Sequence, residues 1–74
     1  MAQLPHLSGR EVVKVFESLG WSQVRRSGSH IILVREGHLA TLSVPDHKEV
    51  AKGTLRSLIR SAGITVDDFV NAMD

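Results

Sequence analysis

Histidine is the residue type in this sequence best suited to proton transfer, because its ordinary pKa lets the ring gain and lose a proton near neutral pH. Four histidines occur, at positions 6, 30, 38 and 47. His30 follows the flexible pair Gly28-Ser29 and opens an expected strand, so its ring can face solvent while Ile31 points into the core. An ordinary polar residue at the start of a strand would give the same pattern. His30 is therefore the first candidate for a general acid or base.

The remaining histidines have weaker settings. His47 lies in a polar loop after Pro45, in a segment that can return beside the expected sheet. We keep it as a candidate second acid or base, with an exposed loop histidine as the alternative. His6 precedes the first expected helix and His38 follows a turn, and neither has a supporting motif. Both are interpreted as structural or incidental.

Motifs typical of other active sites are missing from the sequence. It contains no cysteine, which excludes thiolate metal ligands and cysteine nucleophiles. It also lacks the spacings of zinc-binding histidines, of serine-hydrolase nucleophile turns and of glycine-rich nucleotide loops. We therefore expect neither a metal nor a cofactor, and the chemistry left open is based on histidine.

Positive charge is local rather than general. Nine Lys and Arg against eight Asp and Glu give a formal net charge of +1. The cations gather in the middle of the chain, at Arg25, Arg26, Lys48, Lys52, Arg56 and Arg60. Lys52, Gly53 and Thr54 bring an ammonium, backbone N–H groups and a hydroxyl to the positive end of an expected helix, which suits a phosphate. A solvated surface of mixed charge explains the placement of the cations equally well.

Capping signals and apolar periodicity predict three helices. Ser8 and Glu11 form a capping box, which predicts a helix over 9–19. A second helix is predicted over 51–62, with one apolar and one cationic face. Thr65 and Asp68 predict the cap of a short C-terminal helix.

Between the first two helices, β-branched and apolar residues predict three strands, over 21–26, 30–35 and 38–44. The connections Ser27-Gly28 and Glu36-Gly37 are short, so the strands must pair antiparallel, and the middle strand is expected to be the most buried. The order predicts an α+β fold: a three-stranded antiparallel sheet with helices on one face and the opposite face open.

Length and composition predict one domain over 1–74, with 42% hydrophobic and 23% charged residues. No apolar run approaches the length of a membrane span, and residues 1–7 lack the features of a signal peptide. We expect a cytoplasmic protein that does not bind a membrane.

Several segments together resemble the HicA (YcfA-like) toxin family over nearly the whole chain. The most specific feature is the turn Gly28-Ser29-His30, followed at the right interval by Pro-x-His and Gly-Thr-Leu-Arg. The segments that carry the resemblance are 4–5, 8–11, 19–21, 26–30, 44–47 and 52–63. Trp21 departs from the family, which commonly has Phe or Tyr there, and the turn at Glu36-Gly37 makes a shorter hairpin than in many members.

The resemblance implies an α-β-β-β-α fold like that of double-stranded-RNA-binding domains. It also implies ribosome-independent cleavage of mRNA by the toxin of a toxin–antitoxin pair, with His30 as the catalytic histidine and a HicB-like antitoxin as partner. We expect that antitoxin to cover the His30 site.

The leading hypothesis is thus a metal-independent endoribonuclease of the mRNA interferase kind. The residues expected to contact RNA are Ser29, Arg25, Arg26, Lys48, Lys52, Thr54 and Arg56. The alternative is a non-catalytic RNA-binding module of the same fold, although the near-zero net charge counts against it. A third hypothesis is a protein-interaction module that uses Ile32 and Val34 on the open sheet face.

Overall fold

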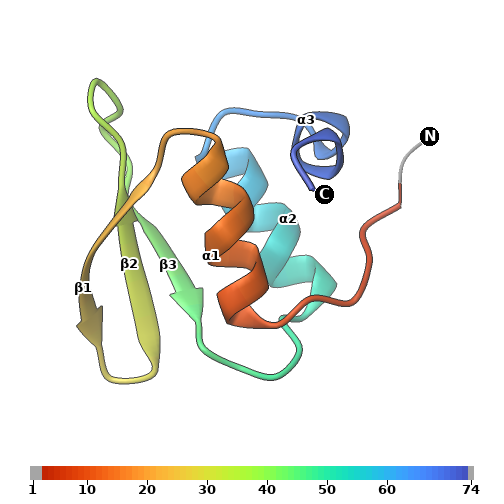
Figure 1. Cartoon of the computed structure of the whole chain (residues 1–74), viewed down its shortest axis with the longest axis horizontal. Helices are drawn as coiled ribbons and strands as arrows, with labels where there is room; N and C mark the ends of the chain where they lie inside the picture. Colours follow the sequence, from red (N-terminus) through yellow and green to blue (C-terminus); the bar gives the residue numbers. More distant parts are fainter. Residues whose placement is uncertain (1–2, 74) are drawn as a thin grey trace.

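Three strands lie between the first and second of three helices. The computed structural model describes residues 3–73. The elements are α1 (Gly9–Ser18), β1 (Ser22–Ser27), β2 (His30–Val34), β3 (Leu42–Pro45), α2 (Lys52–Ser61) and α3 (Val66–Asn71). Figure 1 shows the three helices on one side of the sheet, with α1 in front of α2. The predicted α+β fold is confirmed.

Helix α1 begins as its capping box predicts. The Glu11 N–H donates to the Ser8 hydroxyl (3.2 Å), and the Ser8 N–H donates to the Glu11 carboxylate (2.9 Å). Val12 and Phe16, one turn apart, are completely buried against the sheet and the other helices. Gly20, at φ +100°, then turns the chain away from the helix axis, a conformation that glycine adopts without steric cost.

The sheet has the order β1-β2-β3 with antiparallel pairing, so β2 is the central strand, as predicted. Ile31 and Leu33 of β2 join the core beneath the helices. Because neighbouring residues of a strand face opposite sides, His30 and Ile32 belong to the open face. Ile32 is nonetheless only 8% exposed, so this face offers less apolar surface than the sequence suggested.

The predicted bounds of the third strand are wrong. We expected it over 38–44, but β3 runs Leu42–Pro45, and residues 35–41 form a longer connection than the predicted turn. His38 is the reason, because its ring packs on Trp21 with centroids 4.9 Å apart. Its Nδ1 also accepts the Ala40 N–H (3.3 Å), which keeps this part of the chain out of the ladder.

Strand β1 begins and ends one residue later than predicted and carries an irregularity. Its register with β2 shifts between Gln23 and Arg25, so Val24 has no partner on β2 and is 51% exposed. Trp21 lies before the strand rather than in it, and is buried edge-on against Phe16.

Helices α2 and α3 complete the core. Leu55, Leu58 and Ile59 of α2 are buried, as its predicted apolar face requires. Thr65 and Asp68 form the expected capping box of α3, and Phe69 packs against Phe16 with centroids 5.2 Å apart. Within residues 3–73, no helix has the length and apolar character to cross a membrane.

Candidate functional site

His30 occupies the first position of the central strand, where its main chain is held from both sides. It pairs with Ser27 of β1 and with Pro45 of β3. The residue is exposed, while the next one, Ile31, is 4% exposed and part of the core. The predicted placement of His30, exposed at the start of a strand and followed by a buried Ile31, is therefore confirmed, and its catalytic role stays a prediction.

Three separate segments meet beside His30, at the end of the molecule where β1 turns into β2 (Figure 1). The Asp46 N–H, in the loop after β3, donates to the Ser29 carbonyl in the β1–β2 turn (2.7 Å). The Gly9 N–H, at the start of α1, donates to the His47 carbonyl (2.9 Å). These two bonds hold the turn, the loop and the helix start together.

The close approach of α1 to the loop depends on glycine at position 9. A Cβ atom there would collide with the Pro45 carbonyl oxygen and lie 2.9 Å from the Asp46 Cα. Both obstacles are backbone atoms, which cannot swing aside as a side chain can. Gly9 therefore allows the start of α1 to contact the segment that pairs with His30.

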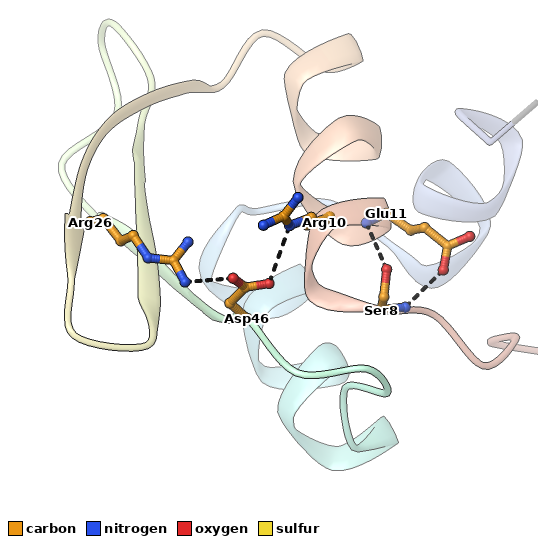
Figure 2. A network of polar contacts seen from close by, with 5 residues as sticks. All are labelled: Ser8, Arg10, Glu11, Arg26 and Asp46. Atoms are coloured by element: carbon orange, nitrogen blue, oxygen red, sulfur yellow. Dashed lines mark hydrogen bonds and ion pairs between the residues drawn. The ribbon is translucent and has the colours of Figure 1, made fainter.

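Asp46 also binds two arginines, as Figure 2 shows. Its carboxylate accepts from Arg26 of β1 (Nη2–Oδ2, 2.5 Å) and lies 3.7 Å from the Arg10 Nε of α1. The Asp46 side chain is 15% exposed. The hydrogen bond from Arg26 lowers the pKa of Asp46 below its usual 3.8, so the carboxylate is ionised at neutral pH. Sequence reasoning placed Asp46 in a polar loop and gave it no role.

The two arginines expected to act together are separated by the sheet. Arg25 pairs with Ile32 and belongs to the open face with His30, whereas Arg26 pairs with Ile31 and faces α1. Arg26 helps line a groove of about 310 Å³ between α1 and β1, together with Arg10 and Lys14. Arg25 and Arg26, both among the residues expected to contact RNA, therefore do not share one face of the sheet.

The expected phosphate-binding residues lie on the exposed side of α2. Lys52, Thr54 and Arg56 are all exposed, and none of them makes an ion pair with another residue in 3–73. No side chain caps the start of α2, where Ala51 is the N-cap, whereas α1 and α3 both have capping boxes. The first N–H groups of α2 are therefore open to an outside acceptor. Ser29 and Lys48 are likewise exposed, in the loops on either side of His30.

The remaining histidines have different settings. His47 is exposed two residues after Pro45, the β3 partner of His30. His6 pairs through Nδ1 with Glu49 (2.7 Å), and His38 packs on Trp21. Among residues 3–73, no group of three histidines or acidic side chains is arranged to hold a metal ion.

Comparisons with known proteins found a similar solved structure and a matching family. A comparison with curated protein sequences found no match. A solved structure described as a toxin–antitoxin complex from Streptococcus pneumoniae superposes with a TM-score of 0.70 and 30% sequence identity, over 78% of this chain and 98% of that chain. Residues 9–64 match the HicA toxin of bacterial toxin–antitoxin systems. On this match, which spans three quarters of its length, the chain belongs to the HicA toxin family.

Proposed function

We propose that this protein is a metal-independent and ribosome-independent endoribonuclease that cleaves mRNA, and that His30 is its catalytic residue. It would act as the toxin of a type II toxin–antitoxin system in the cytoplasm. The observation that carries the proposal is the exposed His30 on the central strand of a HicA-family fold. Catalysis needs a reactive side chain that substrate can reach on a support that does not move, and His30 has both.

The chemistry that suits a histidine without metal is attack of the RNA 2′-hydroxyl on the adjacent phosphate. A base removes the 2′-hydroxyl proton as the new O–P bond forms, and an acid protonates the 5′-oxygen as its bond to phosphorus breaks. The products are a 2′,3′-cyclic phosphate and a 5′-hydroxyl. His30 performs one of these proton transfers, and His47, two residues beyond its strand partner, performs the other.

Proton transfer by one placed side chain supplies about 10²- to 10⁴-fold, so the phosphate itself must also be stabilised. Lys52, Thr54, Arg56 and the uncapped start of α2 offer positive charge and hydrogen-bond donors for the RNA backbone. Three exposed residues surround His30: Arg25 on β1, Ser29 in the β1–β2 turn and Lys48 in the loop after β3. We assign them contacts with the RNA near the cleaved bond. Arg26 faces the other side of the sheet, so we assign it a lesser part in binding.

An antitoxin of the HicB kind is the proposed partner. The Streptococcus pneumoniae structure that resembles this chain is described as a toxin–antitoxin complex, and this chain covers nearly all of the matched chain. We place the antitoxin over the His30 face of the sheet. Steric cover of an exposed residue neutralises the toxin without any change in its structure.

The direct test is incubation of the purified protein with a long RNA in EDTA, with analysis of the product ends. We expect cleavage in EDTA and fragments that end in a cyclic phosphate and begin with a 5′-hydroxyl. Activity that disappears in EDTA and returns with Mg²⁺ or Mn²⁺ contradicts the metal-independent mechanism. Tight RNA binding without cleavage under any condition favours the alternative, a non-catalytic RNA-binding module.

A further inference from the structure

We propose that Asp46 is a positioning residue for RNA cleavage, because it fixes the β1–β2 turn that carries His30 through one backbone bond and two arginine contacts. The inference rests on the proposed function and adds a residue to it. Asp46 comes from the loop after β3, and its partners come from the turn, from β1 and from α1. It is therefore the point at which these four parts of the chain are tied together, and Figure 2 shows its contacts with β1 and α1.

The backbone contact acts directly on the turn. The Asp46 N–H donates to the carbonyl of Ser29, the residue before His30, over 2.7 Å. The residue before Asp46 is Pro45, which faces His30 across the ladder but has no N–H to donate. The bond from Asp46 thus extends the β2–β3 contact past the proline, up to the turn itself.

The Asp46 carboxylate holds the other end of the turn, through Arg26 of β1. Arg26 directly precedes Ser27, the β1 partner of His30, and its guanidinium binds Asp46 at 2.5 Å. A charge-assisted bond of this kind is stronger than a neutral one; the Asp46 side chain that accepts it is 15% exposed, and the Arg26 side chain is 48% exposed. The two ends of the turn, at Arg26 and at Ser29, are therefore both attached to one residue.

Arg10 connects the Asp46 carboxylate to α1. Its Nε lies 3.7 Å from the second carboxylate oxygen, so Asp46 stands between a guanidinium on β1 and another on α1. If the carboxylate is neutralised, the two cations lose their shared partner and repel each other. The side-chain link between β1 and α1 is then lost, which leaves the backbone bonds of Asp46 to Ser29 and of Gly9 to His47.

We assign Asp46 no proton transfer, because its carboxylate binds Arg26 and faces Arg10 on the α1 side of the sheet, whereas His30 belongs to the open face. Its expected effect is on the placement of His30. A displacement of about 1 Å in a catalytic group can cost as much as about 100-fold in rate, so loosening the turn should be visible in kcat.

The test replaces Asp46 by Asn, which keeps the backbone N–H and the shape but removes the charge. With a short RNA substrate, we expect Asp46→Asn to lower kcat by about 10-fold while KM changes by less than about 2-fold. Asp46→Glu restores the charge and should recover part of the loss. The matched control is Glu49→Gln, which neutralises an exposed carboxylate in the same loop that pairs with His6, and its kcat should stay at the wild-type value.

A second measurement does not depend on cleavage. In Asp46→Asn, the NMR order parameters of the Ser29 and His30 amides should fall, while that of Leu33, in the buried part of β2, stays near the rigid value of about 0.85. Unchanged order parameters in the turn, or an unchanged kcat, overturn the proposal. A wild-type protein that does not cleave RNA overturns the proposed function instead, and the order parameters then show separately whether Asp46 holds the turn.

Discussion

His30 illustrates how one residue can be fixed and accessible at once. Its main chain pairs with both neighbouring strands, but its side chain leaves the sheet on the face without helices. Removal of an exposed side chain away from any cap or buried network changes the free energy of unfolding by about 0.5 kcal/mol or less. Substitutions of His30 therefore report on chemistry rather than on folding.

Lys52 is the residue whose proposed role in RNA binding can be measured most directly. It is exposed at the start of α2, with no acidic partner among residues 3–73. In a non-cleaving His30→Ala background, Lys52→Ala should weaken binding of single-stranded RNA and make the slope of log K against log[salt] shallower by about 0.7, the value for one lost phosphate contact.

The control for Lys52→Ala is Lys14→Ala, which removes an equal charge from α1 on the helical side of the sheet. Its binding curve should keep the wild-type slope. A slope that is unchanged in Lys52→Ala places the RNA on another surface.

His47 is a loop residue that lies two positions after Pro45, the β3 partner of His30. If His47 protonates the leaving oxygen, His47→Ala should lose part of the rate and show a changed alkaline limb in its pH–rate profile. Kinetics of the variant between acidic and alkaline pH check this. A profile that superposes on that of the wild type shows that His47 is only a solvated loop residue.

At the scale of elements, the contact between the start of α1 and the β3–α2 loop holds the loop that lies beside His30. Gly9→Ala should be strongly destabilising, because a Cβ atom there meets the backbone of Pro45 and Asp46. Overpacking against atoms that cannot move typically costs about 1–3 kcal/mol, whereas alanine would otherwise favour the helix. Urea unfolding of Gly9→Ala measures this loss.

Gly53→Ala is the matched control, since it adds the same methyl group to the first turn of α2, where nothing lies within 4 Å of the new atom. We expect its unfolding midpoint to equal or exceed that of the wild type. A Gly9→Ala protein that is equally stable would mean that α1 can move away from the loop without cost.

The elements that sequence reasoning predicted well are those whose ends depend on neighbouring residues. The capping boxes of Ser8 and Thr65 lie within four residues of chain, and both helices begin where these motifs predict. The start of β3 could not be predicted in this way. It depends on the packing of His38 against Trp21, which are brought together only by the finished sheet.

The same limit applies to the site. His30 was predicted from the local pattern of a turn followed by a strand. Asp46 was missed, because its partners Arg10 and Arg26 lie far from it along the chain and neither belongs to a recognisable motif with it. Arg25 and Arg26 lie on opposite faces of the sheet because neighbouring residues of a strand alternate between its faces. The sequence predicts this separation once both residues are assigned to one strand, but a list of the positive charges alone does not.

At the scale of the whole molecule, inhibition is expected to be direct occlusion. Among residues 3–73, one hydrophobic core connects the helices to the sheet, which favours inhibition by direct cover of the site over a change transmitted from a distance. RNA and antitoxin should therefore compete for the face that carries His30 and Arg25.

The competition can be measured with His30→Ala toxin and labelled RNA, to which antitoxin is then added. We expect the RNA to be released as antitoxin saturates the toxin. A stable ternary complex in which the RNA affinity is unchanged would rule out occlusion and require another mechanism of neutralisation.

The central claim is that His30 carries the cleavage reaction, and the rate of RNA cleavage by His30→Ala tests it most directly. His6→Ala is the control, because it also removes an exposed histidine, one that pairs with Glu49 away from the turn. With both variants folded by circular dichroism, we predict that His30→Ala cleaves at least about 100-fold more slowly than the wild type in EDTA, and that His6→Ala stays within about 2-fold. Cleavage at the wild-type rate by a folded His30→Ala protein would contradict the claim.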